Sequence, residues 1–470
     1  MSRIETQERI SLSFDRGTLL LTGLARGQLP DACGSSVWRW DTRVGAWRCD
    51  AIHYAGIKQG LVQISSFCDE VMKPVSVNWP KIDLPKLRTE QTEALDGWMK
   101  SGYRGQVIMP TGTGKTEVAL AAMAETKTAT LVVAPVRDLM YQWHRRILKG
   151  LGYDAGIIGD NTFNIKAVTV TTYDSAYIHM GKMGAGFGLL IFDEEHHLPG
   201  RCRREAAILS TAPMRLGLTA TPERSDGLHK DLDFLVGPVA YEMPFKQAKG
   251  TTLADFDVVR IPIALNDKEQ RIYDKCGKEI RDYIVLRRED KPGYSWRDLC
   301  KESGKDPQAR HALKSFHLKT SIESRASEKL RVLEDIFRLH NGQQTLVFVG
   351  SNAMAIEVSK RFLAPTILSH TRKKERQTVL DGFTKGIFKV LVANQVLDEG
   401  VDVPDAKIGV VIGGQGSTRQ AKQRLGRILR KNGNRQATLY EVVCENTREV
   451  QRSRKRRRSD AYERTIHRRV

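Results

Sequence analysis

The 470-residue sequence contains no run of about 18 apolar residues, which is the length that a membrane-spanning helix needs. Its first residues lack the apolar stretch of a signal peptide. Its seven cysteines are odd in number, widely scattered and free of any CxxC pair, which argues against a disulfide framework and a zinc ribbon. We therefore expect a soluble chain that is not exported and whose cysteines are ordinary thiols.

Acidic residues are too few to balance the basic ones. The chain has 75 lysines and arginines against 55 aspartates and glutamates, a formal charge of +20 and a pI of about 9.6. This excess predicts a polyanionic partner, either nucleic acid or an anionic membrane. Hydrophobic residues make up 40% of the sequence, which excludes disorder as the dominant state and is enough for about three domains of ~150 residues.

Two segments concentrate the charge. Residues 448–470 hold ten Lys/Arg and three acids, and we expect a disordered basic tail that is solvated, binds phosphates or serves in targeting. Residues 266–325 hold 15 Lys/Arg and 11 acids with a helical pattern. This second segment is either a solvated helical hairpin or an element that grips nucleic acid.

Residues 1–80 contain short alternating stretches separated by turn signals, which predict a small strand-containing module. Within it, Trp38, Trp40 and Trp47 alternate with arginines. This combination can stack on bases and pair with phosphates, or it can be a set of core tryptophans beside solvated arginines.

From residue 105 onward, apolar β-rich segments alternate with helical ones. The expected strands of the first half are residues 106–109, 130–134, 167–171, 189–192 and 216–218, and those of the second half are 345–349, 364–368, 389–393, 408–412 and 438–443. Repeated βα units predict an α/β fold with two parallel-sheet domains in tandem, each covered by helices.

A phosphate loop is predicted at residues 110–116 (PTGTGKT), between an expected strand and an expected helix. Gly112 and Gly114 let successive backbone N–H groups turn toward one anion, and the helix N-terminus adds its positive end. Lys115 can reach the β- and γ-phosphates and Thr116 can ligate Mg²⁺. The stricter GxxxxGK[ST] pattern has a glycine where this chain has Met109, but nucleotide binding is favoured over a simple glycine-rich turn.

The expected strand at residues 189–192 ends in the sequence DEEH at 193–196. Asp193 at the end of a buried strand can hold Mg²⁺, and Glu194 can orient and deprotonate the attacking water. The alternative is a pair of solvated acids, which the upstream phosphate loop disfavours. His196 and His197 are not accompanied by an HExxH pattern or a spaced Cys/His set, so we do not expect zinc.

Residues 423–430 (QRLGRILR) predict a helix that carries Gln423, Arg427 and Arg430 on one face. Arginines supplied by a second domain can stabilise charge at the γ-phosphate, an effect worth ~10³ to 10⁵ in rate. Taken alone, the segment could be a basic surface helix, and the phosphate loop favours the catalytic role.

The order of these motifs resembles that of superfamily 2 helicases, and most closely the XPB family in its short archaeal or bacterial form. The resemblance covers nearly the whole chain. Its segments are residues 87–91 (the adenine-reading stretch), 110–116 (motif I), 133–136 with 142–143 (motif Ia), 171–176 (a strand-contact motif), 193–196 (motif II), 218–221 (motif III), 346–349 (motif IV), 394–405 (motif V) and 423–430 (motif VI).

The resemblance implies an ATP- and Mg²⁺-dependent DNA helicase or translocase with 3′ to 5′ polarity, acting in DNA repair on single-stranded, forked or damaged DNA. It implies a cytoplasmic, nucleoid-associated protein if the source is prokaryotic, and no membrane partner. The implied domains are a damage-recognition-like module (1–80), a first RecA-like domain (81–250), and a second RecA-like domain (251–447) with a thumb-like insertion (266–325), followed by the tail (448–470).

The resemblance also implies roles for single residues. Gln91 reads adenine. The other implied nucleotide contacts are Thr111, Gly112, Thr113, Gly114, Lys115, Thr116, Gly400 and Asp402. The residues implied to couple the nucleotide to the DNA grip are His196, Thr219, Thr221, Arg224 and Asp226.

One element departs from the family pattern. The Arg-Glu-Asp element reads Arg224, Ser225, Asp226 here, so its central acid is absent. This leaves open a translocase that tracks double-stranded DNA without separating it, or an ATP-switched DNA-binding scaffold that recruits a nuclease or another repair protein. An RNA helicase is disfavoured only by the resemblance.

Overall fold

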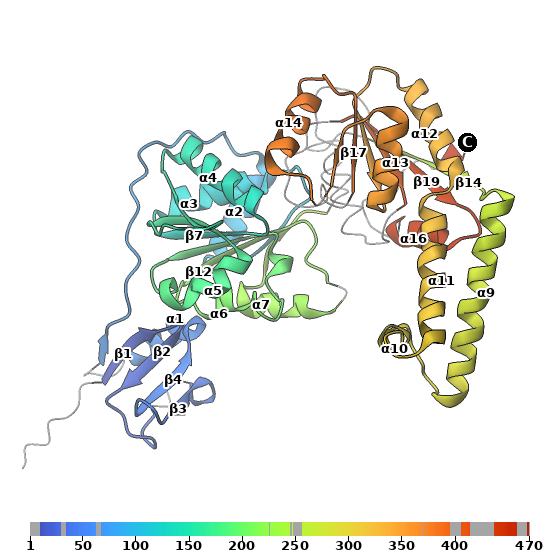
Figure 1. The fold of residues 1–470 in the computed structure, drawn as a ribbon. Coiled ribbons are helices and arrows are strands. Elements are labelled where there is room, and N and C mark those ends of the chain that lie inside the picture. Colours follow the sequence, from blue (N-terminus) through green and yellow to red (C-terminus); the bar gives the residue numbers. More distant parts are fainter. Residues whose placement is uncertain are drawn as a thin grey trace, which may run out of the picture. The chain divides into compact units, whose positions relative to one another are not determined.

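The chain divides into two compact units, Met1–Pro244 and Phe245–Val470 (Figure 1), and each is described by itself. The structure is a computed structural model. It describes residues 10–29, 34–62, 67–224, 226–244, 247, 256–368, 370–394, 406–413, 437–457 and 468–469. Within these residues, no helix is both long and apolar enough to cross a membrane.

The first unit begins with the predicted strand-containing module. Its five-stranded sheet has the order β3-β4-β2-β1-β5. The strands are β1 (Ile10–Asp15), β2 (Thr18–Thr22), β3 (Arg39–Asp41), β4 (Ala46–Asp50) and β5 (Phe67–Asp69), and helix α1 (Tyr54–Leu61) follows β4. Leu12, Leu19 and Leu21 pack with Trp38 in a core of their own. Trp38 is therefore a core residue, as the structural interpretation of the tryptophans predicts.

The rest of the first unit is a parallel sheet of order β13-β6-β12-β11-β7-β10-β8-β9 in which only β9 runs antiparallel. Its strands are β6 (Arg104–Ile108), β7 (Thr130–Ala134), β8 (Gly156–Gly159), β9 (Thr162–Phe163), β10 (Val168–Thr172), β11 (Leu189–Asp193), β12 (Met214–Thr219) and β13 (Val239–Glu242). Every residue of β7 and β10 is buried, which is expected for strands covered on both faces.

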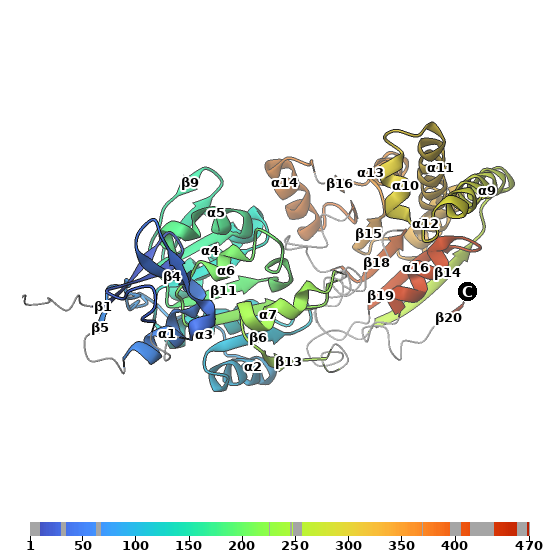
Figure 2. The ribbon, with the colours of Figure 1, turned by 90° about the horizontal axis from the view of Figure 1, so that it is seen from below.

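Helices cover both faces of this sheet (Figures 1 and 2). One face carries α2 (Thr89–Lys100), α3 (Lys115–Thr126) and α4 (Arg137–Leu151), and the other carries α5 (Tyr173–Met183), α6 (Glu205–Ile208) and α7 (Leu232–Leu235). The N-terminal module packs beside the second group, where the ring of His53 lies 5.9 Å from the ring of Phe234.

A fully buried arginine holds α6 and α7 to β12. The guanidinium of Arg215 donates to the backbone carbonyls of Leu235 at 2.6 Å and Ala207 at 3.1 Å. It also donates to the carbonyls of Ser210 and Ala212. Burial lowers the pKa of Arg215 to about 9. Carbonyl dipoles, rather than a carboxylate, therefore compensate this buried cation.

The second unit is built on a second parallel sheet, of order β16-β17-β15-β18-β19-β14-β20. Its strands are β14 (Phe256–Ile263), β15 (Thr345–Val349), β16 (Thr366–Ile367), β17 (Val390–Ala393), β18 (Ile408–Ile412), β19 (Ala437–Cys444) and β20 (Arg468–Arg469). Its helices include α12 (Ser327–Leu339), α13 (Asn352–Phe362), α14 (Lys373–Thr384) and α16 (Arg448–Arg457). The prediction of two parallel-sheet domains in tandem is confirmed.

The predicted helical insertion lies between β14 and α12. It consists of α9 (Asp267–Asp290), α10 (Trp296–Glu302) and α11 (Pro307–Ser324), and α9 and α11 lie side by side (Figure 1). Capping boxes begin α9 at Asn266 and α10 at Ser295, and Pro307 starts α11. The hairpin has a small core of its own formed by Tyr283, Tyr294, Leu299, Ala309 and Ala312.

The expectation of a disordered tail is wrong for residues 448–457, which form α16. Glu449 is only 4% exposed, and its carboxylate accepts hydrogen bonds from Lys329 Nζ at 2.8 and 2.9 Å. One turn later, the buried hydroxyl of Ser453 donates to the buried carboxylate of Glu441 at 2.6 Å. The physical reason is that Glu449 and Ser453 share one helix face, which packs into the second unit.

We expect Glu449→Ala to destabilise the second unit by roughly 3–5 kcal/mol, because the ammonium of Lys329 would remain buried without its counter-ion. Thermal unfolding followed by circular dichroism measures this loss. Glu328→Ala is the matched control, since it removes an exposed partner of Arg331 and should cost less than about 1 kcal/mol. Equal losses in the two variants would show that Glu449 is not part of the core.

Candidate functional site

The phosphate loop connects β6 to α3. Gly112 and Gly114 have φ of +89° and +84°, in the left-handed region that glycine adopts without steric cost. The buried hydroxyl of Thr113 donates to the carbonyl of Pro110 at 2.7 Å and fixes the turn. Met109, which stands where the stricter pattern has glycine, is completely buried, so its side chain packs in the core away from the loop surface.

Lys115 and Gln91 lie against this loop. Lys115 Nζ donates to the carbonyl of Met109 at 3.0 Å. The side-chain amide of Gln91 donates to the carbonyl of Thr113 at 2.9 Å and accepts the backbone N–H of Arg88 at 2.9 Å. Gln91 is 2% exposed, so it positions the loop, and its adenine contact stays a prediction.

The two predicted catalytic acids lie where β11 ends. Trp143 Nε1 donates to Asp193 Oδ2 at 2.9 Å. Burial, followed by the charge of Glu194, raises the pKa of Asp193 to about 6, against the opposing effects of the Trp143 hydrogen bond and Lys115. Glu194 has φ of +49°, which is strained for a residue with a side chain and is typical of functional turns. Its Oε2 lies 3.4 Å from His196 Nδ1.

The five predicted coupling residues come together beside these acids. His196 Nδ1 lies 3.2 Å from Thr219 Oγ1, and this hydroxyl accepts the backbone N–H of Thr221 at 3.1 Å. Arg224 donates to the carbonyl of His196 at 2.6 Å and forms a two-pronged ion pair with Asp226. Hydrogen bonding to Arg224 lowers the pKa of Asp226 to about 2.

Thr219 also connects this network to the phosphate loop, because its carbonyl accepts the backbone N–H of Met109 at 2.9 Å. Strand β12 lies between β6 and β11 in the sheet, and the three strands are parallel. Their carboxyl ends therefore meet at one edge, and the predicted residues of motifs I, II and III converge there.

Several predicted residues lie outside the part of the chain that the structure describes. They are Ser225, Gly400, Asp402, Gln423, Arg427 and Arg430. Their assigned roles remain predictions from the sequence.

The sequence did not reveal what Trp143 and Arg88 do. Trp143 lies in the segment that resembles motif Ia, yet it is 2% exposed and faces Asp193. Arg88 donates a side-chain hydrogen bond to the carbonyl of Thr113 and so holds the phosphate loop. The spacing of apolar residues along α4 puts Trp143 on the same face as Met140 and Ile147 and so predicts that Trp143 is buried. It does not identify Asp193 as the hydrogen-bond partner of Trp143.

The residues at this edge fit a magnesium ion that is held mainly by nucleotide phosphates. Such an ion takes one or two protein ligands, and the carboxylate of Asp193 and the hydroxyl of Thr116 would supply them. Thr111 Oγ1 and Glu194 Oε2 are buried and have no hydrogen-bond partner among the described residues, so polar atoms remain for a ligand and water. Within the same residues, no cluster of three or more His, Cys, Asp or Glu side chains that could hold a metal is present.

The chain is 39% identical over 421 residues to the DNA 3′-5′ translocase XPB2 of Sulfurisphaera tokodaii, an alignment that covers 89% of this chain and 95% of that relative. The chain belongs to the XPB family of superfamily 2 helicases. A second XPB relative, the DNA 3′-5′ helicase XPB of Kineococcus radiotolerans, is 31% identical over 412 residues that cover 84% of this chain and 67% of the relative.

Three family descriptions match parts of this XPB-family chain. They are the Xeroderma pigmentosum group B helicase damage recognition domain (residues 12–65), the type III restriction enzyme res subunit (84–224) and the helicase conserved C-terminal domain (328–432). Among solved structures, the chain resembles the Pyrococcus furiosus Hef helicase domain, with a TM-score of 0.51 and 17% identity over 78% of this chain and 97% of that one. It also resembles Saccharomyces cerevisiae Dbp5 bound to RNA and ADP BeF3, with a TM-score of 0.56 and 16% identity over 82% and 90% of the two chains. These likenesses show the tandem RecA-like fold.

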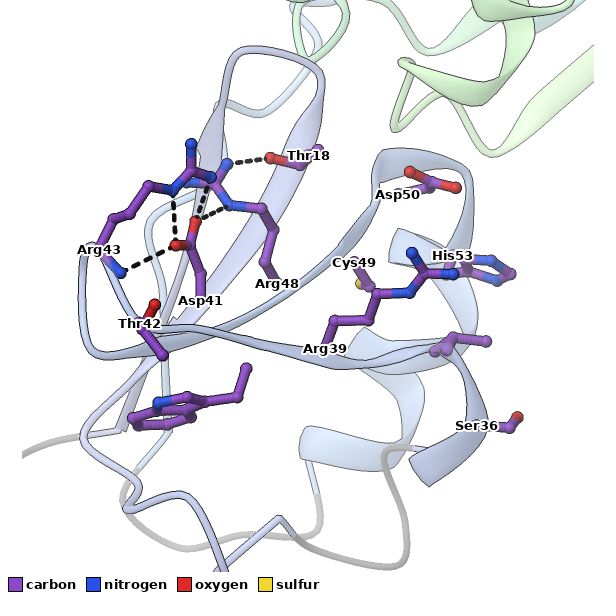
Figure 3. Close-up of a pocket in the computed structure, with 12 residues that line it drawn as sticks. Thr18, Ser36, Arg39, Asp41, Thr42, Arg43, Arg48, Cys49, Asp50 and His53 are labelled. Carbon is purple, nitrogen blue, oxygen red and sulfur yellow. Dashed lines mark hydrogen bonds and ion pairs between the residues drawn. The ribbon is translucent and has the colours of Figure 1, made fainter.

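The segment of the XPB chain that matches the damage recognition domain has a basic cavity of about 580 Å³ (Figure 3). Arg43 and Arg48 converge on Asp41, whereas Arg39 points away from it. Among the described residues, no carboxylate pairs with Arg39. The ring of Trp40, another lining residue, packs edge-on against Trp47 at 5.4 Å.

A second cavity, of about 440 Å³, lies in the first RecA-like domain and is named here the α4–α5 pocket. Arg137 from the first turn of α4 and Ser175 from the first turn of α5 line it, together with Lys182. The β8–β9 hairpin adds Asp160, which forms an ion pair with Arg137 at 2.7 Å, and Phe163, which is 53% exposed. The pocket therefore combines cationic groups with an exposed aromatic ring.

We expect Gly114→Ala to lower nucleotide affinity at least tenfold, because a Cβ there would lie 2.2 Å from Gln91 Nε2 and would displace the side chain that holds the loop. Titration with a fluorescent ATP analogue measures the affinity. Gly102→Ala is the matched control: its φ is +75°, but its Cβ would meet nothing within 4 Å. This control should lose about 1 kcal/mol of stability and keep its affinity. Unchanged binding by Gly114→Ala would contradict the role of the loop.

Proposed function

We propose that this chain is an ATP-dependent DNA helicase or translocase of 3′ to 5′ polarity that works in DNA repair. The observation that carries the proposal is the set of contacts made by Thr219. Its carbonyl accepts the N–H of Met109 before the phosphate loop, and its hydroxyl lies next to His196 after the acids of β11, so these segments share one buried network. Both XPB relatives bear names of 3′-5′ DNA motors, which supports the polarity and the substrate.

In the proposed reaction, Lys115 and the N-terminus of α3 bind the β- and γ-phosphates of ATP. Thr116 and Asp193 would hold Mg²⁺, which would supply charge neutralisation at these phosphates. Glu194 then accepts a proton from the attacking water, and its position next to His196 orients the carboxylate. From the sequence, Gln423, Arg427 and Arg430 are proposed to stabilise charge at the γ-phosphate, and Gly400 and Asp402 to contact the nucleotide.

The partner is proposed to be DNA, which the charge of +20 favours. The α4–α5 pocket offers Arg137 and Lys182 to phosphates of one strand, and the cavity around Arg39 offers a second contact in the module. His196, Thr219 and Thr221 connect the acids to the loop, so they are proposed to pass the nucleotide state to these contacts. If the source is prokaryotic, the same substrate supports the proposal of a cytoplasmic, nucleoid-associated location.

A second candidate function is a translocase that tracks double-stranded DNA, or an ATP-switched scaffold that recruits a nuclease or another repair protein. The absence of an acid at position 225 favours it, since the ion pair of Arg224 with Asp226, together with the hydrogen bond from Arg224 to the carbonyl of His196, is what the described residues keep of that element. No nuclease motif is present in the sequence, so DNA cutting would require a partner.

We expect Lys115→Ala and Glu194→Gln each to lower DNA-stimulated ATP hydrolysis by roughly 10² to 10⁴, because they remove the phosphate cation and the general base. Phosphate release measures the rate. Glu195→Gln is the matched control for Glu194: burial raises the pKa of Glu195 well above its ordinary value, which favours the neutral acid that an amide resembles. Full activity in Glu194→Gln would refute the base assignment.

A strand-displacement assay on forked DNA separates the two candidate functions. A helicase of the proposed polarity displaces the strand of a fork with a 3′ tail and not of one with a 5′ tail. A double-strand translocase hydrolyses ATP and displaces a triplex-forming strand without opening the fork. A scaffold binds DNA stably with negligible turnover.

A further inference from the structure

Two buried aromatic side chains hold Asp193 from opposite faces of the sheet. From α4, Trp143 Nε1 donates to the carboxylate oxygen Oδ2 at 2.9 Å. From α5, the hydroxyl of Tyr173 donates to the backbone carbonyl of Asp193 at 2.9 Å. Trp143 is 2% exposed and Tyr173 is fully buried, so these hydrogen bonds are shielded from water. The carboxylate is thus fixed by groups that belong to neither the phosphate loop nor motif II.

Both helices begin at the α4–α5 pocket. Arg137 is the first residue of α4, and Tyr173 is the first residue of α5, two positions before Ser175. Trp143 lies six residues after Arg137, which is about 9 Å along a helix that rises 1.5 Å per residue. The first turn of α5 is fixed as well, since Thr172 caps it by accepting the backbone N–H of Ser175 at 3.3 Å. A movement of the first turn of α4 or of α5 is therefore transmitted to Asp193 through a short, rigid segment of helix.

We propose that Trp143 is a positioning residue for Asp193, and that through it a nucleic-acid strand in the α4–α5 pocket controls how firmly the enzyme holds Mg²⁺ and nucleotide. Tyr173 holds the backbone of Asp193 in the same way from the other face. The inference rests on the proposed function and adds a route from the strand to the metal-binding carboxylate. The hydrogen bond of Trp143 is distinct from the contacts of His196 with Thr219, which run from β11 toward β12.

The physical reason is that a carboxylate with one oxygen bound to an indole N–H has fewer rotamers to lose when it binds a cation. A hydrogen bond from a neutral donor to a charged group contributes enough to change an affinity roughly tenfold or more. By linkage, if the strand tightens the binding of nucleotide with Mg²⁺, then the nucleotide tightens the binding of the strand by the same factor. Binding measurements alone, without turnover, therefore test the proposal.

The test uses the full chain with Trp143→Phe, which keeps a buried ring and removes the N–H donor. The affinity for a fluorescent, non-hydrolysable ATP analogue is measured in Mg²⁺ and in EDTA, each with and without an oligothymidylate strand. In the unaltered protein we expect Mg²⁺ to strengthen binding and the strand to strengthen it further. In Trp143→Phe we expect the Mg²⁺-dependent gain to fall roughly tenfold and the effect of the strand to fall below about twofold.

Trp98→Phe is the matched control. Trp98 is also fully buried, and its Nε1 donates at 2.8 Å to the backbone carbonyl of Arg215, away from Asp193. This variant loses the same N–H group and a similar volume, so it should keep both affinity gains. If it loses them to the same extent as Trp143→Phe, the effect is general loosening of the core and the proposal is wrong.

Tyr173→Phe keeps the test decisive if Trp143→Phe does not fold, because it removes a single oxygen atom. We expect it to lower the same two gains, and unchanged gains in whichever of the two variants folds would overturn the proposal. An unaltered protein that binds Mg²⁺ and nucleotide without any response to the strand would overturn it as well. Failure of the unaltered protein to bind or hydrolyse ATP would instead refute the proposed function.

Discussion

The candidate site depends on one constraint, which is that the parallel sheet of the first unit is buried on both faces. Strands in such a sheet have room for polar catalytic groups only where they end. Strands β6, β12 and β11 end at Ile108, Thr219 and Asp193, and the hydrogen bond from the N–H of Met109 to the carbonyl of Thr219 aligns the first two ends. The phosphate loop and the acids are therefore brought to one edge by strand register, before any ligand binds.

The turn after β11 directs the side chains of Glu194 and Glu195, which are adjacent in the sequence, to different places. Because Glu194 adopts φ of +49°, its side chain comes near His196, while the next residue points into the core. Glu195 is fully buried, and neither carboxyl oxygen has a hydrogen-bond partner in the described part of the chain. The strained turn therefore places the carboxylate of Glu194 beside His196 and buries that of Glu195, whose pKa burial raises well above its ordinary value.

The sequence predicted most of the fold, because buried strands and amphipathic helices can be recognised from the local spacing of their apolar residues. It also indicated that Lys115, Asp193, Glu194 and His196 lie at or after strand ends, since they stand in recognisable motifs, and their roles stay predictions. It could not predict that Trp143 meets Asp193, which lies 50 residues away, because such a contact depends on how α4 packs. Arg215 is a similar case: its carbonyl partners exist only after α6 and α7 have formed. The expectation of disorder was wrong for residues 448–457 because it rested on net charge and took no account of Glu449 and Ser453, which share a buried helix face.

The ion pair between Lys329 and Glu449 has a consequence for biosynthesis. The two residues are separated by 120 positions, and β14 pairs with β19 over a still longer stretch of sequence. During translation, the first unit can complete its core while the second is still being made, since domains fold as units from the N-terminal end. Folding of the second unit cannot finish until α16 has left the ribosome. Until then, Lys329 in α12 lacks the counter-ion that Glu449 supplies. Synthesis that stops shortly before Glu449 would therefore release a chain with a finished nucleotide-binding half and an unfinished partner, a form that chaperones and proteases are suited to detect.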